Sequence, residues 1–587
     1  MRKLKLSLSL CVLLAAGVAQ AQEVTQSRGV DAQVNYAELT KFGPWDDRNY
    51  QLTAKDLEIL PAHEHTLHDP VPAFFRVEMR KWWKENKDME LRFYPRSALQ
   101  IFKKNFGGYM IEGTLYRKVT KENGRYRVIM EEGLAEEDFR AGKMFAGEVR
   151  VTTPEGAAES SVKISPVDPN IVVAGSNGPG SSQIMHYSSD AGATWTQAAA
   201  LPLGGTCCDP TIDFKDDGSL VHTSTLGNCG FGGCEIWTYR SSDNGQTWND
   251  LEADTPGDPR REVSTDGASD KEFIHTDKFA TSPHINNVYL TWHSGNVMQF
   301  ARSTDDGDNW TTTTFGADPR GIGSDITTDK NGVVYYFWPS LEGGTSSRVV
   351  LKRSNDGGAT FPAGVTTVAN LEDEFDFAIP IMETRRVFIY VAADVDYTDG
   401  PFANSIYASW TDATGPEQGA AANNHARIQV AYSRDGGDTW NTSTPHSTAD
   451  QDDVDRFHQW LAVDESGNVH VVYYDTRLDP NRQNLDFYHT VSTDGAVTWS
   501  DPERLTSVSS GNPADGFEWG DYNGLDVVMG QAIAVFTDNR SETGGGGDSL
   551  DIYAIGKEVE GGVSPEIFSD GFESGDTAPW DITNSGN

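Results

Sequence analysis

Two short phrases in this chain place an aspartate two residues before an arginine. They read Tyr474-Asp475-Thr476-Arg477 and Thr537-Asp538-Asn539-Arg540. A guanidinium group recognises a carboxylate through two parallel hydrogen bonds, and paired carboxyl groups can move protons in catalysis. The segment between the phrases carries Glu518-Trp519-Gly520-Asp521-Tyr522, and His458 precedes the first phrase. On one face of the fold, these side chains would form a pocket for an acidic sugar.

The same phrases also have a structural interpretation. An Asp-x-Arg sequence after a strand can form a local salt bridge that shapes its own loop. Its appearance in two consecutive units is typical of a feature encoded by a repeat. Both interpretations stay open at the level of sequence.

An eight-residue phrase that occurs six times indicates which elements position these side chains. Ser and Asp side chains bind nearby backbone and hold a tight turn, and Gly supplies a positive φ. The aromatic residue at the end buries apolar surface, so we expect a folding device rather than catalytic aspartates. The copies are Ser188–Trp195, Ser241–Trp248, Ser303–Trp310, Ser354–Phe361, Ser433–Trp440 and Ser492–Trp499.

Residues 155 to 558 read as repeating units of short strands, which predicts a β-propeller. The sixth unit shows the pattern best, with strands at Gln459–Asp464, Val469–Tyr474 and Phe487–Val491. The last unit lacks a strand after Ile552–Ile555, and the segment Glu148–Val151 is expected to supply it. We favour seven blades, with six as the alternative. The other units are expected to start near Val162, Thr211, Phe279, Ile326, Val387 and Leu525.

The repeated phrase resembles the Asp box, or BNR repeat, of sialidase-like β-propellers. The stretches Phe457–Asp464, Tyr473–Arg477, Trp519–Leu525 and Phe536–Arg540 are similar to exported bacterial proteins labelled exo-α-sialidase. This resemblance implies cleavage of terminal sialic acid, with three arginines on its carboxylate, a tyrosine nucleophile activated by a glutamate, and an aspartate as general acid/base. By residue type and position, Tyr522 and Glu518 would form the nucleophile pair. The catalytic candidates are Tyr522, Glu518, Asp521, Asp475 and Asp538, and the substrate-binding candidates are Arg477, Arg540, His458 and Trp519.

The chain also departs from the sialidase pattern. It has no Arg-Ile-Pro phrase at the start of the repeats, so the third arginine is unassigned; Arg320, Arg385 and Arg456 are candidates by loop position. Three functions therefore stay open: an exo-α-sialidase, another glycan-directed hydrolase, and a non-catalytic propeller that binds glycans or proteins. The expected partners are glycans or glycoproteins.

The ends of the chain and its charge limit the class of protein. Residues 1–21 have the basic start, apolar stretch and Ala-x-Ala end of a bacterial signal peptide, which predicts a secreted or periplasmic protein. Residues 22–150 are expected to form a small α+β region, 151–558 the propeller, and 559–587 a C-terminal tail. A net charge of −40 argues against nucleic-acid binding, and no later stretch is long enough to span a membrane.

Four cysteines remain after the expected signal peptide. Two acid-rich segments are also candidates for a cation-binding site. Cys207, Cys208, Cys229 and Cys234 are an even number in an exported protein, which predicts disulfides, with three pairings possible. The motifs require no cofactor. Ca²⁺ is a candidate ligand of Asp394–Asp399 and Asp450–Asp455, although neither spacing matches a standard Ca²⁺ loop.

Overall fold

The computed structural model describes most of the chain after residue 148 and four short strands before it. The described residues are 109–111, 114–116, 118–122, 125–129, 148–152, 156–178, 182–230, 233–251, 258–342, 347–373, 375–512, 518–540 and 550–559. Two compact units are distinguished, residues 1–144 with 568–587 and residues 145–567, and each is described by itself. In the first unit β1 (Tyr109–Ile111) pairs with β2 (Thr114–Tyr116), and β3 (Lys118–Glu122) with β4 (Arg125–Ile129).

The second unit is built from antiparallel sheets, and its one described helical element is the 3-10 turn η3 (Ala421–Asn423). The first sheet contains β6 (Ala158–Ile164), β7 (Val172–Gly178), β8 (Ser182–Ser188) and β9 (Thr196–Gln197). A sheet of seven strands contains β10 (Thr211–Phe214), β11 (Val221–Gly230), β12 (Gly233–Ser241), β13 (Arg261–Thr276), β14 (Val288–Ser294), β15 (Val297–Ser303) and β16 (Thr311–Thr314). The next contains β17 (Asp325–Thr328), β18 (Val334–Pro339), β19 (Arg348–Ser354) and β20 (Thr366–Asn370).

The remaining sheets follow in the same manner. The hairpin β21 (Asp376–Ile379) and β22 (Met382–Phe388) stands by itself. The following sheet contains β23 (Val391–Val395), β24 (Ile406–Ala413), β25 (Ala426–Ser433) and β26 (Asn441–Ser443). The next contains β27 (Arg456–Val463), β28 (Val469–Asp475), β29 (Asn484–Ser492), β30 (Glu503–Arg504) and β31 (Ser510–Gly511). The last contains β32 (Gly524–Val528), β33 (Gln531–Asp538), β34 (Asp551–Glu558) and β5 (Val149–Arg150).

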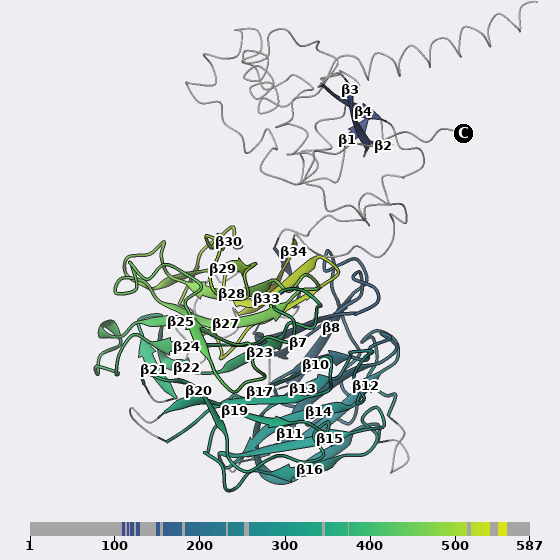
Figure 1. Cartoon of the computed structure of the whole chain (residues 1–587), viewed down its shortest axis with the longest axis vertical. Helices are drawn as coiled ribbons and strands as arrows, with labels where there is room; N and C mark the ends of the chain where they lie inside the picture. Colours follow the sequence, from purple (N-terminus) through teal and green to yellow (C-terminus); the bar gives the residue numbers. More distant parts are fainter. Residues whose placement is uncertain are drawn as a thin grey trace, which may run out of the picture. The chain divides into compact units, whose positions relative to one another are not determined.

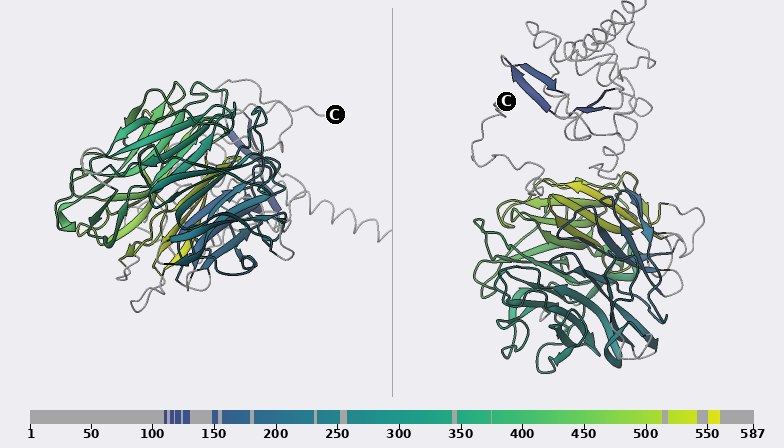
Figure 2. Two further views of the ribbon diagram at one scale, coloured as in Figure 1. Left: turned by 90° about the horizontal axis from the view of Figure 1, so that it is seen from below. Right: turned by 90° about the vertical axis from the view of Figure 1, so that its right-hand side faces the viewer.

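The inner strands of these sheets close into a ring, which makes this unit a β-propeller. In chain order β6, β10, β13, β17, β23, β27 and β32 each contact the next, and β32 contacts β6. The strand β5 pairs with β34, as Glu148–Val151 was predicted to do. Figures 1 and 2 show the yellow-green C-terminal strands beside the blue strands from the start of this unit. Closure of this kind removes exposed sheet edges.

Two predicted unit boundaries are wrong. The strand β13 belongs to two neighbouring units, because its first part pairs with β12 and its second part pairs with β14. The third unit therefore starts before Thr276 and not near Phe279. Val387 lies in the β21–β22 hairpin, and the inner strand of that unit begins at Val391. Because sheets of four, five and seven strands and a separate hairpin result, the preference for seven blades stays a prediction.

All six copies of the eight-residue phrase fold in the same way. In the first, Ser188 Oγ donates to Asp190 Oδ1 at 2.7 Å, and the Gly192 amide donates to Ser188 Oγ at 2.9 Å. The amide and hydroxyl of Thr194 donate to the two oxygens of Asp190 at 2.8 and 2.7 Å. The other copies repeat these bonds. Their aspartates are therefore engaged in turn formation.

Carboxylates on the inner strands tie neighbouring sheets together. Asp213, Asp325, Asp394 and Asp526 each accept a hydrogen bond from a backbone N–H of the next inner strand, at 2.7 to 2.8 Å. Lys163 lies among them, 3.3 Å from Asp526. Burial opposes the charge of Lys163, but these four carboxylates hold its pKa above its usual value. Between neighbouring sheets the core is apolar, for example where Phe487 stacks on Phe536 with ring centroids 4.6 Å apart.

Candidate functional site

Near the start of the inner segments of β6, β10, β13 and β27, one residue has a backbone turned away from regular strand geometry. Glu159, Asp209, Lys271 and His458 have φ values of 55, 58, 51 and 49°. The register of β6, β13 and β27 shifts at these points, as in β-bulges. Such bulges re-aim side chains, and backbone strain of this kind gathers at functional sites. The inner-strand cluster, as we name it, comprises Glu159, Asp209, Asp270, Lys271, Glu272, Arg385, Asp521 and Tyr522.

Arg385 and Asp521 join two distant segments of this cluster. Arg385 Nε and Nη2 donate to the two oxygens of Asp521, each at 2.7 Å, and Nη2 also lies 3.3 Å from Glu159 Oε1. Arg385 comes from β22, so the separate hairpin delivers this guanidinium to the inner strands. Its side chain stays 30% exposed, whereas Asp521 and Glu159 are buried. Burial and the Asp521 carboxylate raise the pKa of Glu159 well above its usual value.

Tyr522 lies between a carboxylate and an ammonium group. Its hydroxyl donates to Asp209 Oδ1 at 3.2 Å. Lys271 Nζ lies 3.3 Å from the centroid of its ring and 4.5 Å from that of Phe273. Among the described residues, none accepts a hydrogen bond from this buried ammonium. Burial, followed by the Asp209 charge, raises the pKa of Tyr522 well above its usual value.

Two further carboxyl groups of the cluster have raised pKa values. Glu272 is fully buried, and neither of its oxygens has a hydrogen-bond partner among the described residues. Burial and the neighbouring Asp209 raise its pKa well above the usual value. Asp270 reaches solvent, yet the surrounding protein and Asp209 raise its pKa to about 6. A solvent-accessible carboxyl group whose pKa is raised in this way can give up or take a proton near neutral pH.

The predicted pairing of Tyr522 with Glu518 is replaced by Tyr522 with Asp209. The Glu518 carboxylate accepts the backbone N–H groups of Glu383, Thr384 and Arg385, each at 3.1 Å. Glu518 therefore holds β22 in place, and burial raises its pKa. Of the predicted catalytic residues, Asp521 and Tyr522 lie in the inner-strand cluster.

The two Asp-x-Arg phrases form local salt bridges. Arg477 donates to Asp475 at 2.5 Å and lies 4.2 Å from the Tyr488 ring centroid. Arg540 donates to Asp538 at 2.5 Å and to Glu148 at 2.6 Å. In both phrases the arginine amide also donates to the preceding aspartate at 2.7 Å. This geometry favours the structural interpretation of both phrases.

The other predicted binding residues are buried or lie elsewhere. His458 is buried, and burial lowers its pKa to about 3, so its ring is neutral. Trp519 is fully buried in the core beside Tyr474. Among the candidates for a third arginine, Arg385 joins the cluster. Arg456 is buried between Asp475 and Asp450, and Arg320 is exposed.

Two disulfides form among the four cysteines, and three aspartates of the acid-rich segments pair with cations. Cys207 is bonded to Cys208, and Cys229 to Cys234. Asp450 pairs with Arg456, Asp455 with Arg482, and Asp399 with Lys330. Within the described ranges, no group of three or more His, Cys, Asp or Glu side chains is arranged to hold a metal ion.

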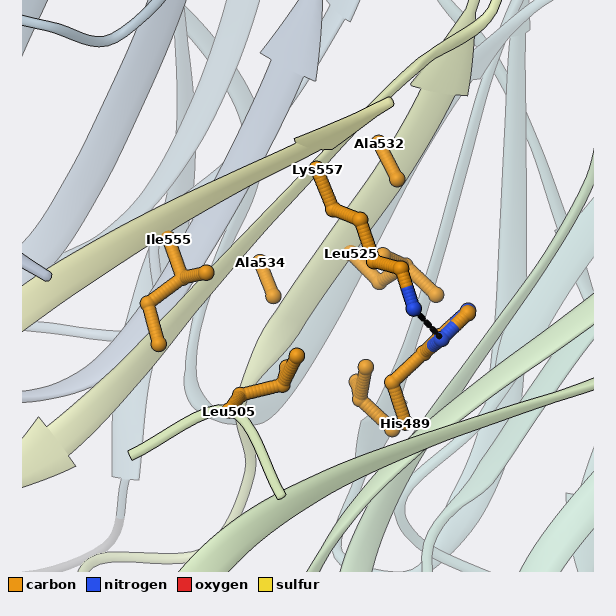
Figure 3. Close-up of a pocket in the computed structure, with 8 residues that line it drawn as sticks. His489, Leu505, Leu525, Ala532, Ala534, Ile555 and Lys557 are labelled. Atoms are coloured by element: carbon orange, nitrogen blue, oxygen red, sulfur yellow. Dashed lines mark hydrogen bonds between the residues drawn. The ribbon is translucent and has the colours of Figure 1, made fainter. Parts of the chain in front are cut away.

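A small apolar cavity lies between β28–β29 and β32–β34, and none of its lining residues belongs to the cluster. Figure 3 shows Lys557 reaching His489, 3.3 Å away, with Leu505, Leu525 and Ile555 along the wall. The cavity has about 10 Å³ of free volume. That is room for one water molecule and not for a sugar ring.

Sequence reasoning missed five members of the cluster: Glu159, Asp209, Asp270, Lys271 and Glu272. They precede or begin inner strands, so the same loop-position argument that selected Asp521 applies to them. Asp209 directly follows Cys207-Cys208, which the sequence had drawn attention to for another reason. Tyr522 and Asp209 lie 313 residues apart, and only closure of the ring brings them together.

Comparisons with known proteins give a family match in the first part of the chain. Residues 35–120 match a family described as Domain of unknown function (DUF8300). None of the curated proteins matches the chain. Among the described residues, no helix has the length and apolar character needed to cross a membrane.

Several solved structures are similar at low identity. A protein of unknown function from Dyadobacter fermentans is 13% identical over 70% of this chain and 98% of its own, with a TM-score of 0.37. An α-L-arabinofuranosidase from Fusarium graminearum is 9% identical over 71% and 98%, with a TM-score of 0.37. An intramolecular trans-sialidase from Ruminococcus gnavus is 12% identical over 57% and 94%, with a TM-score of 0.36. The description as a β-propeller rests on the strand connections above.

Proposed function

We propose that this chain is an exported, glycan-directed β-propeller whose inner-strand cluster hydrolyses a glycosidic bond. The observation that carries this proposal is the hydrogen bond from Tyr522 to Asp209 beside the accessible Asp270, whose pKa is about 6. In this reaction Asp270 donates a proton to the leaving oxygen. Asp209, held by Tyr522, acts as the base or nucleophile on the sugar.

The charges of the cluster favour a neutral sugar over sialic acid. Five carboxyl groups face two cations, and Arg385 already binds Asp521 with two hydrogen bonds. A sialic acid carboxylate would compete with Asp521 for that guanidinium. The other arginines that the sialidase resemblance implied, Arg477 and Arg540, are held by Asp475 and Asp538. An uncharged sugar avoids this repulsion.

The test is hydrolysis of a panel of 4-methylumbelliferyl glycosides, with neutral pentosides and hexosides beside the α-sialoside. Asp209→Asn and Asp270→Asn should each lower kcat/KM by about 100-fold or more, the usual scale for a general acid or base. Tyr522→Phe should lower it less, because Asp209 is retained. Tyr473→Phe is the matched control, since it removes a buried hydroxyl whose partner is the Pro445 carbonyl.

No turnover of any glycoside by folded protein would contradict the enzymatic proposal. In that case binding to a glycan array would support the non-catalytic alternative.

Export is tested separately by N-terminal sequencing of protein from the periplasm or medium of a bacterial host. The expected first residue is Gln22, and an uncleaved Met1 in the cytoplasm would contradict it.

A further inference from the structure

The Cys207–Cys208 disulfide joins adjacent residues and directly precedes Asp209. Bridging neighbouring cysteines closes a small covalent ring that includes the peptide between them. The conformations open to that peptide are therefore restricted. The next residue along the chain is the carboxylate that accepts a hydrogen bond from Tyr522. One peptide bond therefore joins the bridged Cys208 to a proposed catalytic residue.

Asp209 has a backbone conformation that its sequence does not favour. Its φ is 58°, in the left-handed region that residues other than glycine rarely adopt. It also precedes Pro210, and the residue before a proline is normally extended. A conformation of this kind persists only where the surroundings impose it.

Hydrogen bonds and packing contacts on both sides of Asp209 hold this conformation. Its amide donates to Asn177 Oδ1 at 2.8 Å. Pro210 packs closely on β7, where a Cβ added to Gly175 would lie 2.7 Å from Pro210 Cβ. On the other side, Cys207 donates its amide to the Leu226 carbonyl at 2.7 Å, and the Leu226 amide donates to the Cys208 carbonyl at 3.2 Å. The disulfide is the covalent member of this set.

We propose that the Cys207–Cys208 disulfide is a positioning element that holds the Asp209 carboxylate on Tyr522, and that a small dithiol switches the site off by reducing it. Both cysteines are only half-buried, so a small reductant can reach them, and they pack against the apolar cluster that includes Leu226 and Ile236. A thiolate of the dithiol attacks one sulfur and forms a mixed disulfide. The second thiolate of the dithiol then attacks this mixed disulfide and releases the protein sulfur. The reductant is left as a cyclic disulfide. Cys207 and Cys208 become thiols, because they gain the two electrons and two protons that the dithiol loses.

The predicted loss of activity rests on the proposed function. The energetic coupling between Tyr522 and Asp209 can be measured whether or not the protein is an enzyme. We would measure that coupling from thermal midpoints of Tyr522→Phe, Asp209→Ala and the double variant. In the oxidised protein the two changes should be non-additive. In a Cys207→Ser/Cys208→Ser background they should become additive. The matched background is Cys229→Ser/Cys234→Ser, which removes the other disulfide and should leave the non-additivity intact.

A second measurement covers the case in which the serine background does not fold. Wild-type protein is treated with dithiothreitol and iodoacetamide, and mass spectrometry identifies which cysteines are alkylated. Alkylation of Cys207 and Cys208 should coincide with at least a ten-fold loss of kcat/KM on any glycoside that is turned over. Alkylation of both with unchanged coupling and unchanged turnover would overturn the proposal. Coupling that depends on the disulfide, in a protein without turnover, would overturn the proposed function alone.

Discussion

Arg385 and Asp521 lie 136 residues apart and meet through two hydrogen bonds of 2.7 Å. The pair joins the β21–β22 hairpin to the start of β32, and Glu518 fixes the same hairpin through three backbone amides. Because the Asp521 carboxylate is buried, the two hydrogen bonds from this guanidinium offset part of the cost of removing its charge from water.

Replacing Arg385 with lysine should destabilise the protein although the charge is kept. An ammonium group cannot reproduce the two parallel hydrogen bonds of a guanidinium. The expected loss is about 1–3 kcal/mol, the range for leaving buried polar groups unsatisfied. Urea unfolding measures it. Arg353→Ala is the control, since that arginine pairs with Asp438 at the surface and should cost at most about 1 kcal/mol. Equal effects of both variants would contradict this account.

The arginines of the two Asp-x-Arg phrases should matter for stability and not for catalysis. Arg477→Ala removes a charge-assisted bond to the fully buried Asp475. We expect a lower thermal midpoint, with kcat/KM on the preferred glycoside within about two-fold of wild type. Arg540→Ala should behave in the same way through Asp538. A large loss of turnover at a normal thermal midpoint would restore the substrate-clamp interpretation.

Features set by local sequence could be predicted, and features set by ring closure could not. The sixth unit was predicted within a few residues, because alternating strands and the eight-residue phrase are local signals; its strands are Arg456–Val463, Val469–Asp475 and Asn484–Ser492. The Asp475–Arg477 contact spans two residues, so its salt bridge was also foreseeable. Arg385 was one of three candidates for an arginine at the site. Its partner Asp521 becomes evident only once the separate hairpin is placed.

The glycine of the eight-residue phrase should be hard to replace. Gly437 has a φ of 90°, and an added Cβ would lie 2.5 Å from Leu351 Cδ2 in the preceding sheet. Gly437→Ala should therefore cost about 1–3 kcal/mol through backbone strain and steric conflict. The chain supplies its own control, because Ala496 occupies the same position in the sixth copy with a φ of 67°. Ala496→Gly should change the thermal midpoint little, and similar losses in both variants would contradict the argument.

Asp325 should make the protein less stable as the pH rises from about 4 to 7. Burial raises its pKa from 3.8 to about 7, so the folded state keeps a proton that the unfolded state releases. Stability falls wherever the folded state binds more protons, at about 1.4 kcal/mol for each unit of pKa difference, and levels off above the folded pKa.

Asp325→Asn removes this titration. Between pH 5 and 8, the unfolding free energy of the variant should rise relative to wild type. Asp213→Asn is the control: the pKa of Asp213 is lowered to about 2, so its contribution is constant over this range. A difference between Asp325→Asn and wild type that does not change with pH would show that Asp325 is ionised throughout.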